Sequence, residues 1–356
     1  MVISPDKGDG FPPPATAGTV LPPSSPTTRS PNNNLADSPG GLAATGSDTV
    51  LATAGYDHTI KLWQVGTALC FKTFQHPDSQ VNDLAISPDR KSVAAAGFQH
   101  VRIYDVQGSG QSPAVNFEGL TKNVTCIGFN RDGQWMFSGG EDDNARIWDL
   151  RTNATQKVFQ THSSPITCAT LHPNNTELII ADQSGTIHLW NLKNDKTEQL
   201  IPDQSGTVPI QDVAIDPSGK FLAAVNNKGD CYIWTLDGGN GEEIRLSPFH
   251  RLKAHSRYAL TCCFSPDSSL LATTSADQTC KIWKMSDSSL VADLHCSGQR
   301  WVWSAAFTGD SQYIITASSD NLARLWSLET ARTEREYNGH QKPVTCVAYR
   351  DPSILY

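Results

Sequence analysis

The feature that most constrains this chain is an aromatic residue that returns at nearly constant intervals. Seven such residues each close a short apolar run, and they stand 41, 44, 42, 44, 49 and 43 residues apart. They are Trp63, Tyr104, Trp148, Trp190, Trp234, Trp283 and Trp326. Further runs of small and β-branched residues lie between them, separated by Pro, Asp, Ser or Gly, which is the pattern of strands and tight turns. Each interval therefore predicts one supersecondary unit that must stack on its neighbours.

The clearest copy of the unit runs from Leu260 to Trp283 and reads LTCCFSPDSSLLATTSADQTCKIW. Its apolar runs are separated by Ser265-Pro266-Asp267 and by Asp277, and a weaker fourth run follows the tryptophan. Four strands in a period of about 40–45 residues are the signature of WD-repeat propellers. The sequence predicts an all-β fold: a seven-bladed WD-repeat β-propeller with four antiparallel strands per blade.

The two ends of the repeat array predict how the ring closes. The first run, Val50–Gly55, matches the second strand of the unit, so the chain begins one strand late. The last run, Val344–Tyr349, matches a first strand and has no second strand after it. We expect this C-terminal strand to complete the first blade, because an open ring would leave unpaired strand edges.

The chain divides into two segments of different composition. Nine of the 21 prolines lie before Gly40, mixed with Ser, Thr, Asn and Gly. Such a segment cannot bury enough apolar surface to offset its ordering entropy. We predict a disordered Pro/Ser-rich leader over residues 1–47 and the propeller over residues 48–356.

Charge and cysteine usage exclude several classes of function. The net charge is −8 and no long basic run is present, which argues against a nucleic-acid surface. No apolar stretch approaches 18 residues, so no direct membrane insertion is expected. The nine cysteines lie mostly in strand runs without a C-x-x-C pair, which favours a reduced, cytoplasmic protein without disulfides or zinc. We predict no cofactor and no metal.

Polar residues that accompany the aromatic repeat predict a structural hydrogen-bonded set rather than a catalytic one. In each complete set Ser or Thr precedes Asp by four residues, and Asp precedes Trp by six. Blade six offers His255, Thr273, Asp277 and Trp283, and blade one offers Thr53, Asp57 and Trp63 with His340 from the closing segment. A hydrolase triad is needed once, whereas these sets recur. The sequence therefore predicts tetrads that satisfy buried polar groups, and no enzyme.

Two positions at the entrance of each first strand are predicted to face the mouth of the central channel. They are aligned by the turn that follows the strand, and strand alternation would put both on one side. Most blades carry small or polar residues there, including Gln80 and Asn82 in blade two. Blades six and seven instead offer Tyr258, Leu260, Trp301 and Trp303. These aromatics predict a protein-binding patch, with packing inside the channel as the alternative.

The chain resembles a known family through segments beyond the generic repeat. They include ATAGYDHTIKLWQ, GGEDDNARIWDLR, RYALTCCFSPDSSLLATTSADQTCKIW and GDSQYIITASSDNLARLW. Together they are similar to the small WD-repeat, G-beta-like subunit of the TOR kinase complexes, over about Val50 to Tyr349. The Pro-rich leader departs from the short N-terminus of that family.

The resemblance implies a non-catalytic scaffold subunit shared by TOR complex 1 and TOR complex 2. It would bind the TOR kinase catalytic domain, beside other TOR complex subunits, and would not form a homo-oligomer by itself. The implied contact residues are Gln80, Asn82, Trp301 and Trp303, with Tyr258 beside them. The implied location is cytoplasmic, with peripheral association with vacuolar or endosomal membranes through the complex. A substrate-recruiting adaptor of a ubiquitin ligase is the alternative, although such adaptors normally carry an extra N-terminal domain.

Overall fold

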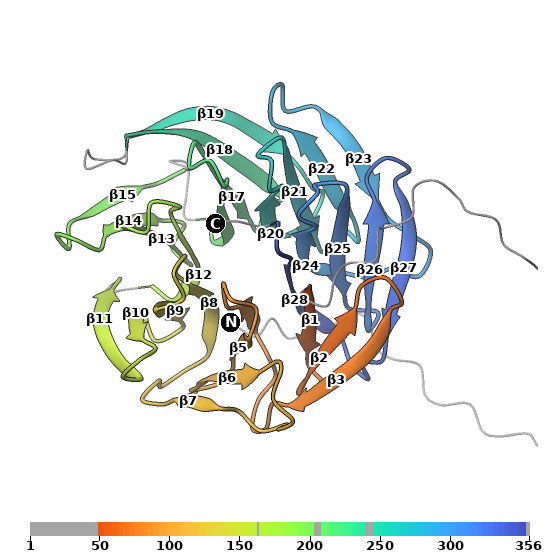
Figure 1. Ribbon diagram of the computed structural model, residues 1–356. Helices are drawn as coiled ribbons and strands as arrows, with labels where there is room; N and C mark the ends of the chain where they lie inside the picture. Colours follow the sequence, from red (N-terminus) through yellow and green to blue (C-terminus); the bar gives the residue numbers. More distant parts are fainter. Residues whose placement is uncertain (1–48, 162–163, 203–207, 239–244, 354–356) are drawn as a thin grey trace, which may run out of the picture. The chain divides into compact units, whose positions relative to one another are not determined.

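The computed structural model describes residues 49–161, 164–202, 208–238 and 245–353. These residues form seven four-stranded antiparallel sheets arranged in a ring (Figure 1). The predicted seven-bladed propeller is therefore confirmed. The predicted leader, residues 1–47, lies outside the described residues.

Each blade has its first strand at the channel and its fourth strand on the outside. In that order, blade one contains β28 (Val344–Arg350), β1 (Val50–Gly55), β2 (Thr59–Gln64) and β3 (Leu69–Gln75), and blade two contains β4 (Asp83–Ile86), β5 (Ser92–Ala96), β6 (Val101–Asp105) and β7 (Val115–Phe117). Blade three contains β8 (Val124–Phe129), β9 (Trp135–Gly140), β10 (Asn144–Asp149) and β11 (Ala154–Gln160), and blade four contains β12 (Ile166–Leu171), β13 (Glu177–Asp182), β14 (Ile187–Asn191) and β15 (Thr197–Leu200). Blade five contains β16 (Ile210–Ile215), β17 (Phe221–Asn226), β18 (Asp230–Asp237) and β19 (Arg245–Lys253). Blade six contains β20 (Ala259–Phe264), β21 (Leu270–Ser275), β22 (Cys280–Lys284) and β23 (Leu290–Leu294), and blade seven contains β24 (Val302–Phe307), β25 (Tyr313–Ser318), β26 (Leu322–Ser327) and β27 (Arg332–Asn338).

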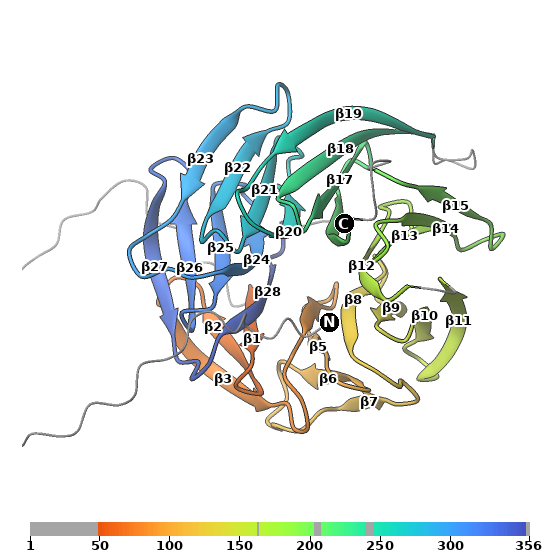
Figure 2. The same cartoon turned by 180° about the vertical axis from the view of Figure 1, so that it is seen from behind.

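The last strand closes the ring, as the sequence predicted. β28 pairs antiparallel with β1, with Leu51 opposite Tyr349 and Ala52 opposite Ala348. The two strands lie side by side in both views along the ring axis (Figures 1 and 2). A second link joins blade seven to blade one: the hydroxyl of Tyr337, on β27, donates to the Val65 carbonyl at 3.1 Å. We call blade one the closing blade, because both ends of the repeat array meet in it.

Burial explains why the second strands are rich in small and β-branched residues. All six residues of β1 are buried, and five of the six in β21 are, because these strands are packed on both sides between neighbouring blades. One apolar cluster accordingly joins Val50 and Leu62 of blade one to Val93 and Tyr104 of blade two. The outermost strands, such as β11, are mostly exposed and have more polar sequences.

A β-bulge interrupts the first strand in six of the seven blades. The strand pairing skips one residue in each, namely Thr125, Thr167, Gln211, Leu260, Trp303 and Thr345. A bulged residue breaks the strict alternation of side chains. Leu260, predicted at the channel mouth with Tyr258, is 8% exposed, whereas Tyr258 is 43% exposed and Trp303, at the same bulge position in blade seven, is half-buried.

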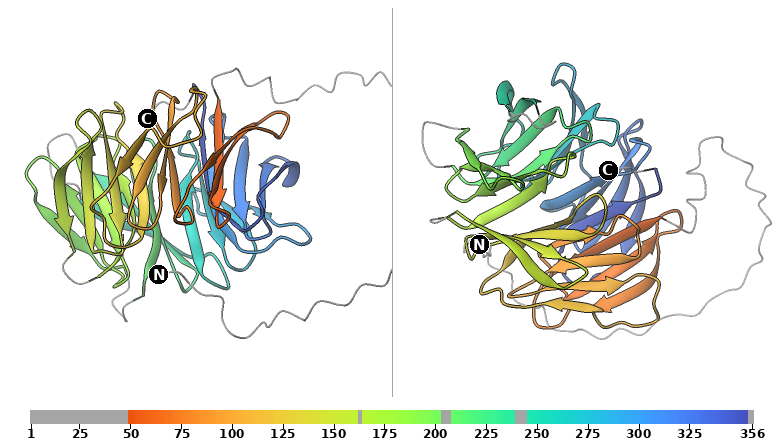
Figure 3. Two further views of the ribbon diagram at one scale, coloured as in Figure 1. Left: turned by 90° about the horizontal axis from the view of Figure 1, so that it is seen from below. Right: turned by 60° about the vertical axis from the view of Figure 1, so that its left-hand side comes forward.

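The strands of every blade run between two faces of the ring, and their connecting loops lie on those faces (Figure 3). Over the described residues, no helix is long and apolar enough to cross a membrane. All nine cysteines lie in the described part of the chain, and all are free thiols. Eight of the nine are buried or half-buried, and only Cys70 is exposed.

Candidate functional site

Two sets of loops meet on one face of the ring, which we call the entry face. One set leads into the first strands, and the other joins the second strands to the third. The backbone N–H of Tyr56 donates to the Pro343 carbonyl at 3.0 Å, and that of Ser319 donates to the Trp301 carbonyl at 2.9 Å. Equivalent bonds join Glu141 to Asn123, Gln183 to Pro165, Asn227 to Pro209 and Ala276 to Tyr258. The predicted partner-binding positions therefore share a face that backbone hydrogen bonds hold in place.

The aromatic residues of blades six and seven lie at this face. Trp301 and Trp303 are half-buried, and their ring centroids are 5.5 Å apart at an interplanar angle of 47°. The Trp303 indole N–H donates to Ser319 Oγ at 2.6 Å, which fixes the orientation of that ring. Tyr258 is 43% exposed. We call Tyr258, Trp301 and Trp303 the aromatic patch; its two tryptophans pack on one another and still reach solvent.

Gln80 and Asn82 lie in the loop that leads into blade two, and both are half-buried. The Asn82 side-chain amide donates to the Val124 carbonyl of blade three at 2.9 Å. Thr125 and Thr345 make corresponding bonds to the carbonyls of Ile166 and Val81 in their next blades, at 3.0 and 2.9 Å. Asn82 therefore ties two blades together with its nitrogen, and its side-chain oxygen is directed to no donor among the described residues.

Phe98 is exposed at the entry face, although its place in the sequence predicted no role for it. Its side chain is 47% exposed, and its backbone pairs with Asn123 in an isolated bridge. The Phe98 N–H donates to the Ser79 hydroxyl at 3.0 Å, next to Gln80. The sequence contained one indication that this position differs. Phe98 stands six residues before Tyr104, and blades one and six carry an aspartate six residues before their own aromatic.

The tetrad of blade six is a continuous chain of hydrogen bonds. The Trp283 indole N–H donates to Thr273 Oγ1 at 3.0 Å, and the same oxygen lies 2.9 Å from His255 Nε2. His255 Nδ1 lies 3.0 Å from Asp277 Oδ2, and Ser256 N–H also donates to that oxygen. These bonds link the loop before blade six to its second and third strands.

Blade one repeats this arrangement with residues from both ends of the repeat array. The Trp63 indole N–H donates to Thr53 Oγ1 at 2.7 Å, and His340 Nε2 lies 2.7 Å from the same oxygen. His340 Nδ1 lies 2.9 Å from Asp57 Oδ2, which also accepts the Gln341 N–H at 3.0 Å. The tetrad therefore fastens the closing segment to the first strands of the chain.

The aspartates of these tetrads have pKa values well below the ordinary range of a carboxyl. Burial alone would raise the pKa of Asp57, but the hydrogen bond and charge of His340, with the Gln341 N–H, lower it by more. The same balance lowers the pKa of Asp277, through His255, Thr279 and Ser256. Both aspartates are thus held as carboxylates at neutral pH, in the role of hydrogen-bond acceptors.

The other blades fasten their loops with different residues. In blades three and seven an arginine replaces the histidine, since Arg146 lies 2.7 Å from Asp142 and Arg324 lies 2.6 Å from Asp320. The indole N–H groups of Trp148 and Trp326 still donate to Ser138 and Thr316, at 2.8 and 2.9 Å. In blade four His188 lies 3.0 Å from Asp182. The sequence pattern did not predict these partners of the aspartates, Arg146, His188 and Arg324, each of which stands two residues before the aromatic of its blade.

The buried acidic groups of the innermost strands also have structural partners. Burial raises the pKa of Asp83 and of Asp212 to about 7 each, against the effect of the backbone N–H groups that they accept. Asp83 accepts the Ile127 N–H of blade three at 2.9 Å, and Asp212 accepts the Cys262 N–H of blade six at 2.9 Å. Both carboxyls therefore link adjacent blades. Among the described residues, no group of three or more His, Cys, Asp or Glu is placed to hold a metal ion.

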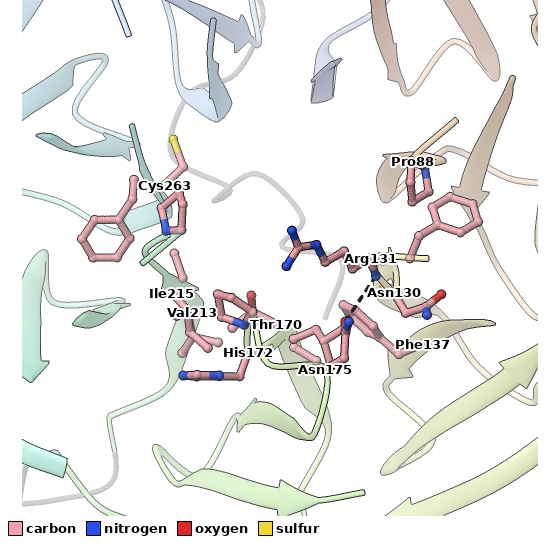
Figure 4. Close-up of a pocket in the computed structure, with 18 of the residues that line it drawn as sticks. Pro88, Asn130, Arg131, Phe137, Thr170, His172, Asn175, Val213, Ile215 and Cys263 are labelled. Atoms are coloured by element: carbon pink, nitrogen blue, oxygen red, sulfur yellow. Dashed lines mark hydrogen bonds between the residues drawn. The ribbon is translucent and has the colours of Figure 1, made fainter. Parts of the chain in front are cut away.

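A cavity of about 380 Å³ is lined by the turns that follow the first strands, on the far side of the blades from the entry loops. Its walls combine apolar and polar groups, and the Arg131 side chain extends toward its open centre (Figure 4). The Arg131 backbone is fixed by Asn175, whose side-chain oxygen accepts the N–H at 3.2 Å. None of the predicted partner-binding residues lines this cavity, so it is separate from the entry face.

Comparison with known proteins identifies both the repeat and its relatives. The family described as "WD domain, G-beta repeat" matches residues 31–64, 68–105, 111–149, 153–191, 246–284 and 288–327. The chain is 54% identical over 321 residues to the target of rapamycin complex subunit LST8 of Bos taurus, covering 87% of this chain and 97% of that protein. It is 45% identical over 306 residues to the target of rapamycin complex subunit wat1 of Schizosaccharomyces pombe (86% and 96% covered) and 41% identical over 302 residues to LST8 of Saccharomyces cerevisiae (85% and 99% covered).

Proposed function

This chain belongs to the family of the target of rapamycin (TOR) complex subunit LST8, and on that premise we propose that it is a non-catalytic subunit that binds the TOR kinase catalytic domain. In this proposal the entry face is the contact surface, and its contact residues are Gln80, Asn82, Tyr258, Trp301 and Trp303. The protein would serve as a scaffold in both TOR complex 1 and TOR complex 2. It would reach vacuolar or endosomal membranes only through the assembled complex.

The observation that carries this proposal is the state of the aromatic patch. Trp301 and Trp303 are held by a ring contact and by the Ser319 hydroxyl, yet neither is fully buried. Rigid, partly exposed aromatics bind a partner at low entropic cost and are typical anchors of protein interfaces. Gln80 and Asn82 add uncharged hydrogen-bonding groups, which suit the polar rim of such a contact.

A pull-down from cells tests the proposal. The tagged wild-type protein, the Trp301→Ala/Trp303→Ala variant and a Phe71→Ala control would be purified in parallel. Phe71 is a suitable control because it is 57% exposed on the outermost strand of blade one. We expect the TOR kinase to copurify with the wild type and the control, and to be depleted with the double variant, which must keep its melting temperature.

The outcomes separate the two parts of the proposal. Equal recovery of the kinase with all three proteins would remove the tryptophans from the contact. Absence of the kinase from the wild-type sample would refute the assignment to the TOR complexes.

A further inference from the structure

Phe98 occupies a position, counted back from the aromatic that closes the third strand, at which blades one, three, six and seven carry an aspartate. It lies six residues before Tyr104, as Asp57 and Asp277 lie before their own aromatics, in a hairpin loop that is one residue shorter than theirs. The side chains of these two aspartates are 5% and 10% exposed. Phe98 is 47% exposed. Blade two has therefore exchanged a buried acceptor for an aromatic ring that faces solvent.

Other residues perform the structural task of the missing aspartate. His76 is fully buried, and its Nδ1 lies 3.0 Å from the Tyr104 hydroxyl. Its Nε2 lies 2.9 Å from His100 Nε2. The Tyr104 hydroxyl donates in turn to the Gln75 carbonyl at 3.1 Å. Blade two thus fastens its loop without the side chain at position 98, so stability of the blade does not explain an aromatic there.

The loop that carries Phe98 is fixed at each residue. Gly97 N–H donates to the His100 carbonyl, Phe98 N–H to the Ser79 hydroxyl and Gln99 N–H to the Lys122 carbonyl, each at 3.0 Å. Gln99 adopts a left-handed conformation with φ of 64°, as His58 and Gln278 do at the same place in their blades. The ring of Phe98 is therefore presented on a pre-ordered loop, which lowers the cost of binding.

The surroundings of Phe98 distinguish it from most exposed apolar residues of the chain. Leu69, Phe71, Val158, Leu290 and Val291 lie on outermost strands. Phe98 and Tyr258 instead lie in loops of the entry face. The neighbours of Phe98 are Gln80, through Ser79, and Asn123, through the backbone bridge. The charged residues Lys122 and Glu141 lie next to them, because Lys122 accepts the Gln99 N–H and Glu141 accepts the Asn123 side-chain amide.

We propose that Phe98 is a second aromatic anchor for the partner of the entry face, an inference that rests on the proposed function. The matching site on the TOR kinase would be an apolar depression with hydrogen-bonding groups at its rim. Blade one contacts blade seven on one side and blade two on the other. An interface that includes the aromatic patch and Phe98 therefore extends across the closing blade.

Binding of the purified full-length chain to the purified TOR kinase catalytic domain tests this inference. The dissociation constant would be measured by biolayer interferometry for the wild type, Phe98→Ala, Phe98→Tyr and Phe71→Ala. We expect Phe98→Ala to weaken binding by about ten-fold or more, as loss of an interface anchor does. Phe98→Tyr keeps the ring and should stay within about three-fold of the wild type, and Phe71→Ala within about two-fold. Because Phe98 is exposed, all variants should keep the wild-type melting temperature.

Each other outcome has a definite meaning. A wild-type protein that binds, with Phe98→Ala within about two-fold of it, overturns the anchor and leaves the proposed function intact. An equal loss in Phe98→Ala and Phe71→Ala also overturns the anchor, because the effect would not be specific to the entry face. A wild-type protein that does not bind the catalytic domain overturns the proposed function and this inference with it.

Discussion

Removal of the Asp57 carboxylate should weaken the ring where its two ends meet. Asp57 Oδ2 is shared by His340 Nδ1 and the Gln341 N–H, and Oδ1 accepts the N–H and hydroxyl of Thr59 at 3.2 and 2.8 Å. Asp57→Ala removes all four contacts and leaves His340, which is fully enclosed, without its acceptor. Each buried donor that loses its acceptor costs about 1–3 kcal/mol, so the variant should lose about 3–5 kcal/mol in all. Asp57→Asn, which keeps the shape but not the charge, should cost about 1.5–3 kcal/mol.

Urea denaturation followed by tryptophan fluorescence would measure these losses, with Asp277→Ala as the matched control. Asp277 makes the same contacts in blade six, through His255, Ser256 and Thr279, but all within one short stretch of chain. The two alanine variants should lose similar free energies of unfolding. Only Asp57→Ala should also accelerate amide exchange in β28, because only its contacts hold the closing segment.

The pH dependence of this effect has a defined sign. The pKa of Asp57 is lower in the folded than in the unfolded protein, so its stabilisation is complete above the ordinary carboxyl pKa of about 4 and declines as the pH falls below it. Wild-type stability in Asp57→Ala, or unchanged exchange in β28, would refute the view that this tetrad fastens the ring.

Four other changes test contacts elsewhere in the ring. Removing residues 344–356 should expose β1 as a sheet edge and make the protein aggregate, which size-exclusion chromatography would show. A soluble monomer that melts cooperatively would contradict ring closure by β28. Trp283→Phe should lower the free energy of unfolding by about 1 kcal/mol in urea denaturation, because Thr273 keeps its hydrogen bond to His255 when the indole N–H is lost. A loss above about 3 kcal/mol would show that the packing of the indole ring dominates. Burial lowers the pKa of His76 to about 3, so the contribution of this residue to stability falls as the pH drops below about 6.5. Between pH 7.5 and 5.5 the free energy of unfolding of the wild type should fall by about 1.4 kcal/mol more than that of His76→Gln. Parallel pH profiles of the two proteins would contradict this. Gly97→Ala should destabilise blade two by about 1–3 kcal/mol, because a Cβ would lie 2.6 Å from His76 Nε2 and 2.7 Å from His100 Nε2, and an unchanged melting temperature would show that the histidines can move.

The strands were predictable because every blade repeats the same turn chemistry. Val50–Gly55, Leu270–Ser275 and the closing strand from Val344 have the expected places in the sheets, and β28 extends one residue further, to Arg350. Spacing also predicted the residues of the two complete tetrads. Turns and spacing are local signals, so a single sequence contains them.

Features that depend on contacts between blades were not predictable in the same way. Leu260 was predicted at the channel mouth with Tyr258, but its side chain is buried, and the neighbours that cover it come together only in the folded ring. The histidine pair of blade two combines His76, which stands as far before Tyr104 as His255 does before Trp283, with His100, which has no counterpart in the tetrads. The exposure of Phe98 depends on the hydrogen bonds that hold its loop in the folded blade, and those bonds are not visible in a single sequence.

The closing blade connects the stability of the ring with the proposed interface. Its integrity depends on β28 pairing with β1, on the tetrad of Asp57 and His340, and on the bond from Tyr337 to Val65. A partner that contacts the aromatic patch on one side and Phe98 on the other would lie over this blade and bind only the closed ring. Such a ligand adds RT ln(1 + [L]/Kd) to the stability of the closed state. The entry face and the ring closure are then parts of one equilibrium. Mutations of the tetrad in blade one, none of whose residues is a proposed contact, should therefore weaken partner binding.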